Sequence, residues 1–456
     1  MASSFQYLLL LLLLFASSSS SSAKLSFRPK ALVLPVTKDD STLQYITHIH
    51  QRTPLVPLNL VLDLGGQNLW VDCEQHYTSS TYRPARCNSA VCSAADFWHC
   101  AQCFEPPRPG CTNNTCTLLA DNPLDATIAV SDVGQDLVSV QSTNGFYPGQ
   151  NVSVSRFVFG CAPNYLLRQL ADGASGMAGL GRTKISAPSQ FSSAFSFPRK
   201  FAICLASHSK GVVFFGDGPY VLLPDVDAAK FLIYTPLILN PVSTASIPRE
   251  GKPSSEYFIG VKSIKIEDKV VPNINKNLLS INKEGFGGTK ISTLNPFTVL
   301  ESSIFKAVTE AFISARNYTR VVGVAPFEAC FSSNGIGSTR LGPAVPTIEL
   351  VLQNDASWSI FGANSVVQVK DDVMCLGVVN GGAKPRTAIV IGGFQLENHL
   401  VQFDLASSRL GFSPLLFWRR TTCANFNFTS AAGTAAVLRD DLNAEFENKM
   451  SFSVIE

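Results

Sequence analysis

Short runs of β-branched and aromatic residues alternate with turn residues along most of the chain, which is the pattern of β-strands. The clearest helical stripe spans residues 302–315, where apolar side chains recur on one face. Many strands and few short helices predict an all-β, barrel-like architecture. The expected strands lie at residues 31–36, 59–62, 137–141, 152–159, 211–215, 256–266, 347–352, 365–369 and 400–404.

Two halves of the chain carry a related pair of motifs. A strand leads into Asp-Leu-Gly-Gly at residues 63–66, and another leads into Ser-Thr-Leu-Asn at residues 292–295. Two apolar residues and a glycine follow much later in each half, within residues 177–181 and 390–393. This repetition predicts two related lobes, with residues 222–241 as the crossover.

The chain opens with an apolar run from Leu8 to Ala16, followed by a serine tract and Ala23. The run is shorter than the ~20 residues of a membrane-spanning helix, so we predict a signal peptide over residues 1–23 and a secreted protein. Nothing in the later sequence predicts a membrane span. We expect an N-terminal lobe at 24–230, a C-terminal lobe at 231–428 and a disordered extension at 429–456.

Composition narrows the function classes. The chain is 46% hydrophobic and only 15% charged, which is typical of a globular protein, and its net charge of +2 gives no electrostatic case for a nucleic-acid partner. There is no phosphate-binding glycine loop. His48 and His50 share one strand face, but two ligands do not make a metal site. We therefore expect neither a cofactor nor a metal.

The sequence holds an even number of cysteines, which predicts up to six disulfides in an exported chain. Seven of them crowd into residues 73–116, a Cys-rich insertion in the first lobe, where Cys100 and Cys103 superficially resemble half of a zinc site. Spacing leaves the pairing open, although Cys330 and Cys375 suit a staple within the second half. The twelve are Cys73, Cys87, Cys92, Cys100, Cys103, Cys111, Cys116, Cys161, Cys204, Cys330, Cys375 and Cys423.

Four Asn-x-Ser/Thr sequons are further signs of export. They begin at Asn113, Asn151, Asn317 and Asn427. Each is a candidate glycosylation site and, where used, marks exposed surface.

The duplicated motifs resemble those of the pepsin-type aspartic proteases, over about residues 30–428. In that family each lobe supplies an Asp-Thr/Ser-Gly loop above an apolar-apolar-Gly turn. The resemblance implies a bilobal pepsin-like fold and a pair of carboxylates that share one proton and activate a water. Asp63 is retained here, but Leu64 and Gly66 replace hydroxyl residues, and Ser292 stands where the second Asp is expected.

These substitutions predict an inactive site with no catalytic residue, in which Asp63 and Ser292 are vestigial. A serine hydroxyl holds its proton too tightly to share it, so the water loses one of two bases. No Asp lies within ten residues of Ser292, and no Tyr between Tyr82 and Tyr147 can serve as the family's flap tyrosine. We expect Asp63 to titrate like an ordinary carboxylate and to accept backbone N–H bonds.

A closer resemblance is carried by residues 27–37, 211–220, 256–262 and 421–429. These segments resemble the plant extracellular dermal glycoproteins, which belong with the xyloglucan-endoglucanase inhibitors, the wheat-type xylanase inhibitors and the basic 7S globulins. The resemblance implies an inactive glycoprotein of the plant cell wall that acts in defence. Its implied partner is a secreted microbial endoglucanase, of the xyloglucan-specific endo-β-1,4-glucanase type, which it binds and inhibits as a monomer.

A glycosidase cleft is open and holds two carboxylates, so an arginine on a loop suits it as an inhibitory contact. Arg340 lies in the glycine-rich stretch 335–343, and Arg419 and Arg420 precede Cys423. Both stretches match loops that carry inhibitory residues in the family. The second loop lacks the histidine of the cereal xylanase inhibitors, which agrees with the endoglucanase inhibitors. We expect Arg340 and Arg420 to be the contacts, with Arg419 as a substitute for Arg420.

Two other functions stay open. The chain could be an active aspartic endopeptidase, which acid-dependent cleavage of a denatured protein would favour. Alternatively, it could be a hormone-binding or storage protein like the basic 7S globulins, which chain nicking and oligomerisation would favour.

Overall fold

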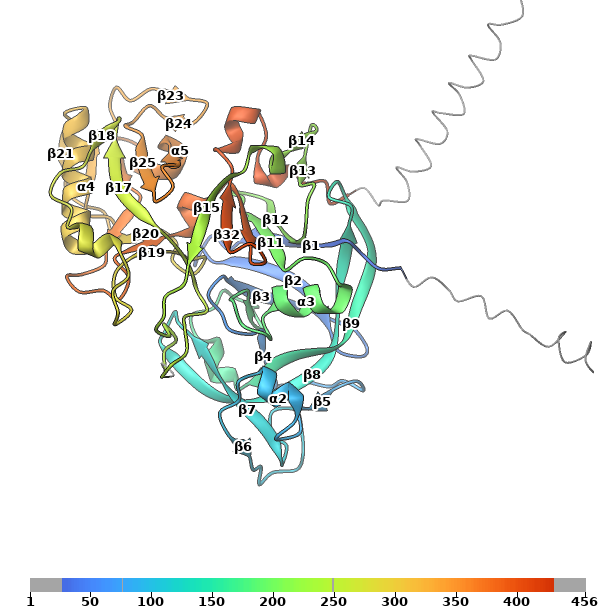
Figure 1. Ribbon diagram of the computed structural model, residues 1–456. Helices are drawn as coiled ribbons and strands as arrows, with labels where there is room; N and C mark the ends of the chain where they lie inside the picture. The colour runs from blue at the N-terminus through green and yellow to red at the C-terminus, as the bar shows by residue number, and fades with distance from the viewer. Residues whose placement is uncertain (1–26, 76, 248–249, 430–456) are drawn as a thin grey trace, which may run out of the picture.

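The computed structural model describes residues 27–75, 77–247 and 250–429. The predicted signal peptide and nearly all of the predicted C-terminal extension lie outside these residues. Two strand-rich lobes stand side by side, and Figure 1 shows the first half of the chain on the right and the second half on the left. The predicted all-β architecture with short helices is confirmed.

The first half of the chain forms β1 (Ala31–Lys38), β2 (Tyr45–Gln51), β3 (Val56–Asp63), β4 (Trp70–Asp72), β5 (Arg83–Pro84), α2 (Ala90–Ala94), β6 (Cys100–Ala101), β7 (Thr115–Asn122), β8 (Thr127–Thr143), β9 (Pro148–Ala162), η1 (Asn164–Leu167), β10 (Gly176–Gly179), α3 (Ala187–Phe195), β11 (Lys200–Cys204), β12 (Lys210–Gly216), β13 (Val221–Leu222), β14 (Val226–Asp227) and η2 (Ala228–Phe231).

The second half forms β15 (Ile233–Ile238), β16 (Tyr257–Ile259), β17 (Val261–Ile266), β18 (Lys269–Val270), η3 (Lys276–Leu279), β19 (Thr289–Ile291), β20 (Thr298–Leu300), α4 (Ser302–Ala315), β21 (Arg320–Val321), β22 (Cys330–Ser332), β23 (Ser338–Thr339), β24 (Gly342–Pro343), β25 (Ile348–Leu352), β26 (Ser357–Ile360), α5 (Gly362–Ser365), β27 (Val366–Lys370), β28 (Val373–Leu376), β29 (Val378–Asn380), β30 (Ile389–Ile391), α6 (Gly393–Leu396), β31 (Leu400–Asp404), β32 (Arg409–Phe412), η4 (Leu416–Arg419) and η5 (Cys423–Asn425).

Each run predicted as a strand overlaps one or two observed strands, and the predicted helix is α4. Its buried stripe is the predicted one, with Ile304, Val308 and Phe312 among its members. The helix begins where the Glu301 carboxylate accepts hydrogen bonds from the N–H groups of Ser303, at 2.9 Å, and Ile304, at 3.2 Å. This cap gives hydrogen-bond partners to two backbone N–H groups of the first helical turn, which have no acceptor within the helix.

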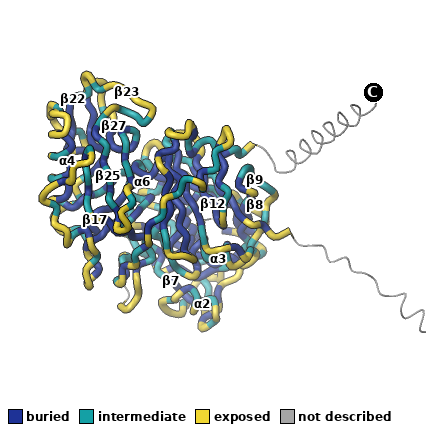
Figure 2. The backbone as a smooth tube through the Cα atoms, turned by 45° about the horizontal axis from the view of Figure 1, so that its top comes forward, coloured by how far each residue is buried: buried dark blue, intermediate teal, exposed yellow. Residues whose placement is uncertain are grey.

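A single antiparallel run of strands joins the lobes. It passes from β1 through β12 and β11 of the first half to β31, β32 and β15. At the junction Phe201 of β11 faces Phe403 of β31, and their rings stack with centroids 4.7 Å apart. One apolar core continues through both lobes, and Figure 2 shows the buried strands inside a shell of exposed loops.

The predicted duplication is confirmed by the strand pairing. In the first half β10 lies parallel to β3 and antiparallel to β4, so that Gly179 lies beside Asp63. In the second half β30 lies parallel to β19 and antiparallel to β20, which brings Ile391 beside Ile291. A Cβ atom on Gly179 would collide with the Asn68 carbonyl oxygen, and one on Gly392 would collide with the backbone of Phe297. Each lobe thus places a glycine turn in close contact with the loop that follows its paired strand, β3 in the first half and β19 in the second.

All twelve cysteines form disulfides, as predicted. Cys100 and Cys103, which resembled half of a zinc site, belong to two different disulfides, with Cys87 and Cys111 as their partners. In the second lobe Cys330 pairs with Cys375 as expected. The full set is Cys73–Cys161, Cys87–Cys100, Cys92–Cys116, Cys103–Cys111, Cys204–Cys423 and Cys330–Cys375.

The described residues offer neither a membrane-spanning helix nor a cluster of metal ligands. None of the helices in that part of the chain has the length and apolar character needed to cross a membrane. Nor do three or more His, Cys, Asp or Glu side chains gather there in a group that could hold a metal ion.

A buried carboxylate clamps the lobes together. Glu397 follows α6 and is 3% exposed. Its Oε1 accepts a hydrogen bond from the Tyr45 hydroxyl at 2.8 Å and pairs with the Lys38 ammonium at 2.7 Å, both from the first half of the chain. The Tyr45 ring also fills the space beside Gly393, where a Cβ atom would collide with it.

We predict that Glu397→Ala lowers the free energy of unfolding by about 3 kcal/mol, because it leaves the Lys38 ammonium largely buried without its partner. Denaturant unfolding of the secreted protein measures the loss. The matched control is Glu105→Ala, which removes an exposed pair with Arg108 at 3.1 Å and should cost less than about 1 kcal/mol. Equal losses for the two variants would contradict the clamp.

Candidate functional site

The two positions predicted to be vestigial meet in one cavity. Asp63 ends β3 and Ser292 follows β19, and both line a cavity of about 170 Å³ between the lobes. The strand pairing of the duplicated motifs brings them together from positions 229 residues apart.

The Asp63 carboxylate is held by its own turn. Its Oδ1 accepts a hydrogen bond from the Gly65 N–H at 2.8 Å, which is the backbone contact expected from the sequence. Beside it, the Thr293 hydroxyl accepts from the Leu64 N–H at 3.2 Å and donates to the Leu62 carbonyl at 2.5 Å. One threonine therefore braces the two loops from the second lobe, whereas Leu64 is buried and offers no hydroxyl in return.

Ser292 closes its own turn. Its Oγ accepts hydrogen bonds from the N–H groups of Leu294, at 3.2 Å, and Asn295, at 3.3 Å. Its backbone N–H donates to the Ile391 carbonyl at 2.9 Å. The hydroxyl thus does the local structural work of a turn residue and supplies no second carboxylate.

The expectation that Asp63 titrates normally is wrong. Burial raises its pKa to about 7, and the negative charge of Asp121 on β7 adds to the shift, while the Gly65 N–H opposes it. Asp63 is 8% exposed, so water cannot stabilise its ionised form. Burial raises the pKa of Asp121 as well. Asp121 comes from a strand far from either loop in sequence, so the motifs gave no sign of it.

A buried ion pair also lines this cavity. The Lys290 ammonium lies 2.6 Å from Oε1 of Glu256, and each side chain is about one-fifth exposed, at 20% and 19%. A Cβ atom on Gly65 would lie 2.8 Å from Cγ of Glu256, so the close approach requires glycine there. The cavity therefore holds a cation and three carboxylates rather than a symmetrical acid pair.

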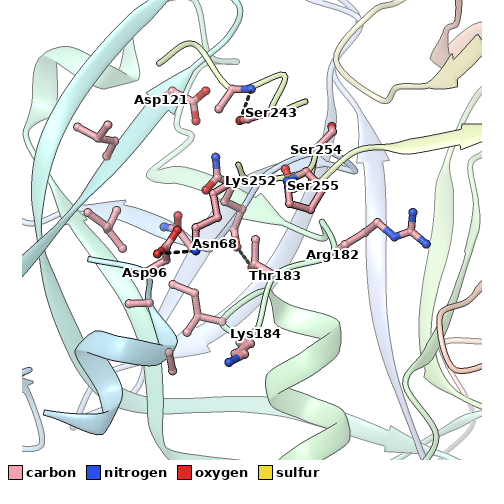
Figure 3. Close-up of a pocket in the computed structure, with 18 of the residues that line it drawn as sticks. Asn68, Asp96, Asp121, Arg182, Thr183, Lys184, Ser243, Lys252, Ser254 and Ser255 are labelled. Carbon is pink, nitrogen blue, oxygen red and sulfur yellow. Dashed lines mark hydrogen bonds and ion pairs between the residues drawn. The ribbon is translucent and has the colours of Figure 1, made fainter. Parts of the chain in front are cut away.

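A segment of the second half bridges the cleft between the lobes. It connects β15 to β16, and its Ser246 hydroxyl donates to Oδ2 of Asp121 at 3.1 Å. The Ser255 hydroxyl donates to the Gly65 carbonyl at 2.7 Å. Figure 3 shows the Lys252 ammonium reaching the Asp96 carboxylate, at 3.2 Å, across a neighbouring cavity of about 530 Å³. The described residues of this segment thus contact the first half of the chain at Asp121, Gly65 and Asp96, beside the two cavities.

Arg340 lies at the tip of the β23–β24 hairpin and is exposed. The Thr339 hydroxyl donates to the Gly342 carbonyl at 2.7 Å and accepts from the Leu341 N–H at 3.1 Å. Gly342 has a φ of +95°, a conformation that favours glycine. These contacts fix the hairpin that presents the guanidinium.

Arg419 and Arg420 differ in their surroundings. The Arg419 guanidinium lies 3.9 Å from the ring centroid of Phe231, which ends η2. Arg420 follows η4 with a φ of +57° and is exposed. Among the described residues, neither the Arg340 nor the Arg420 side chain makes an ion pair.

The two arginine loops lie on one edge of the molecule. The Ala363 N–H donates to the Leu341 carbonyl at 2.8 Å, and Phe361, two residues earlier, packs edge-on against Trp418 with centroids 6.1 Å apart. Figure 1 shows β23, β24 and the red segment around η4 along the same upper edge. The sequence named the arginines but gave no sign of this aromatic link between their loops.

The four sequons reach solvent to different extents. Asn113, Asn151 and Asn317 are exposed, and Asn427 is partly exposed. Their use as glycosylation sites stays a prediction.

We predict that Asp63→Asn stabilises the protein at neutral pH. The pKa of Asp63 is higher in the folded than in the unfolded chain. The carboxyl group therefore contributes fully to the free energy of unfolding below about pH 4, and this contribution is lost as pH rises through about 7. The neutral amide removes this cost, which amounts to at most about 4 kcal/mol. Denaturant unfolding should show a gain at pH 7.5 that vanishes near pH 3.5. A gain that is the same at both pH values would contradict the assignment.

Two family descriptions match most of the chain. Residues 45–217 match "Xylanase inhibitor N-terminal" and residues 256–414 match "Xylanase inhibitor C-terminal". The protein named "Probable aspartic proteinase GIP2" from Nicotiana benthamiana is 62% identical over 416 residues, 90% of this chain and 94% of that protein. "Basic 7S globulin" from Glycine max is 39% identical over 412 residues, 88% of this chain and 92% of that protein.

Solved structures agree with these sequence matches. The structure titled "Crystal structure of edgp" superposes with a TM-score of 0.87 at 60% identity, covering 89% of this chain and all (100%) of that chain. The basic 7S globulin from soybean superposes with a TM-score of 0.76 at 37% identity, covering 88% and 100%. The predicted bilobal pepsin-like fold is confirmed by both. The chain therefore belongs to the xylanase-inhibitor-like family of aspartic-protease-like proteins, together with the basic 7S globulins.

Proposed function

We propose that this protein is a secreted, proteolytically inactive inhibitor of microbial glycoside hydrolases in the plant cell wall, with a xyloglucan-specific endo-β-1,4-glucanase as its target. The observation that carries the proposal is the presentation of Arg340 and Arg420 on one edge of the molecule, where neither lines the cavities between the lobes. An exposed guanidinium without an ion pair can bind one of the two carboxylates of a glycosidase cleft bidentately.

The loops that carry these arginines are held in place before any partner binds. The disulfide Cys204–Cys423 ties the segment after Arg420 to β11. The Thr421 hydroxyl donates to the Leu223 carbonyl at 2.6 Å and anchors the same turn from the other side. Such preorganisation lowers the entropic cost of binding, which suits a tight inhibitor.

Two features support the lack of peptidase activity. Ser292 offers no carboxylate to share a proton with Asp63, and the segment between β15 and β16 crosses the cleft. The name of the Nicotiana relative describes that protein as a probable aspartic proteinase. Here the cavity holds the Lys290 ammonium beside its carboxylates, an arrangement that does not suit a proton-sharing pair.

We predict that the mature protein inhibits a xyloglucan-cleaving fungal endoglucanase and that Arg340→Ala and Arg420→Ala each weaken inhibition by at least about 30-fold, because each leaves a buried carboxylate of the enzyme unpaired. A panel of purified endoglucanases and xylanases provides the measurement. Arg156→Ala, an exposed position on β9 of the first lobe, is the matched control and should inhibit like the wild type. If no hydrolase responds at micromolar protein, the inhibitor function is wrong and hormone binding or storage becomes the better proposal.

We also predict that Ser292→Asp gains no peptidase activity at acid pH. Leu64 cannot brace the second loop, Leu294 replaces the family's glycine, and the cleft is still crossed by the protein's own chain. Cleavage of a denatured protein between pH 3 and pH 5 (roughly the range in which a carboxylate pair shares a proton) measures the outcome. Robust cleavage by this variant would show that the missing carboxylate alone silences the site.

A further inference from the structure

Trp418 is one of two exposed tryptophans in the described part of the chain, the other being Trp98. The Trp418 side chain is 54% exposed, whereas the Trp70 and Trp358 side chains are buried, at 3% and 2%. Trp418 sits on η4 between the buried Leu416 and the exposed Arg420. An exposed tryptophan beside unpaired arginines has the composition of a binding hot spot rather than of ordinary surface.

The orientation of Trp418 is fixed from two sides. The Phe361 ring meets the indole edge-on, with an interplanar angle of 76°. The next residue, Arg419, stacks its guanidinium on Phe231 and so ties η4 to the segment that follows β14. This contact holds Arg419 against its own protein, so it is a poor candidate for direct contact with a partner.

The surroundings of Trp418 extend the apolar area across both halves of the chain. Leu223, directly after β13, is 51% exposed, and its carbonyl accepts the hydrogen bond from the Thr421 hydroxyl. Exposed positive charge lies nearby, on Arg420 two residues after Trp418 and on Arg340, whose hairpin is linked to Trp418 through the segment that carries Phe361. A flat apolar ring between two cations is complementary to an acidic cleft with aromatic walls.

We propose that Trp418 is the apolar anchor of the hydrolase-binding surface and occupies a sugar-binding subsite of the endoglucanase, while Arg419 acts only as a positioning residue. This inference rests on the proposed inhibitor function. Glycosidase subsites hold glucosyl rings against aromatic side chains, and an indole presents a flat apolar face of similar breadth. With Trp418 in such a subsite, Arg420, two residues away, reaches toward the catalytic carboxylates.

The test is the affinity of the secreted protein for an inhibited endoglucanase, measured by calorimetry with and without a cello-oligosaccharide that fills the subsites. Trp418→Ala should weaken binding by at least about 30-fold, as truncation of an aromatic hot spot does. Trp418→Phe, which retains a flat ring, should lose less than about 5-fold. The oligosaccharide should compete with the wild type.

Trp98→Ala is the matched control, because Trp98 is similarly exposed, at 48%, and lies just before β6 at the opposite end of the molecule in Figure 1. It should bind like the wild type. An unchanged thermal midpoint for Trp418→Ala excludes misfolding as the cause of its loss.

The role of Arg419 is tested by a double-mutant cycle. If Arg419 acts only through Trp418, then Arg419→Ala weakens binding in the wild type and has no further effect in the Trp418→Ala background. Additive losses would show that Arg419 contacts the enzyme itself, contrary to the proposal.

The outcomes separate this inference from the inhibitor function. If Arg420→Ala weakens binding and Trp418→Ala does not, the anchor is wrong while the inhibitor function stands. If the wild type binds no hydrolase, both fall. Failure of the oligosaccharide to compete with the wild type would place Trp418 outside the sugar subsites and overturn the proposal.

Discussion

The pairing of β11 with β31 is the constraint on which the rest of the structure depends. These strands belong to different halves of the chain, and their register brings Phe201 against Phe403 in the centre of the shared sheet. Tyr257 packs on the same Phe403 ring, with centroids 4.5 Å apart. It is the first residue of β16, the strand that follows the segment connecting β15 to β16. Because the sheet is continuous, the lobes cannot separate without breaking a ladder of hydrogen bonds and an aromatic core.

That fixed relation between the lobes does not depend on a pair of carboxylates in the cleft. The glycine turns beneath the two loops are needed for the close backbone approach there, and both are present although Ser292 offers no carboxylate. The charge of Asp63 is instead influenced by Asp121, and the Lys290–Glu256 pair fills the same cavity. Asp63, Asp121, Glu256, Lys290 and Ser292 thus line one cavity between the lobes, where each makes a structural contact or influences a neighbouring charge.

Local features could be predicted from the sequence, and contacts between distant segments could not. Periodicity located the helix at residues 302–315, and one disulfide, Cys330–Cys375, followed from its place in the second half. The fold class followed from the repeated motifs. The pKa of Asp63 could not be inferred, because it depends on burial and on a strand about sixty residues away along the chain. The link from the Arg340 hairpin through Phe361 to Trp418 is likewise formed only in the folded chain.

The same sheet that closes the cleft also supports the proposed inhibitory edge. The C-terminal segment covers the outer face of this sheet, where Leu416 and Cys423 are buried against β11 and β12. The disulfide to Cys204 then holds that segment on the strand that makes the junction between the lobes. A loop fixed in this way loses little entropy on binding, so a few exposed side chains can provide most of the affinity. A rigid surface of this kind suits the proposed role, in which the protein presents a fixed surface to another enzyme.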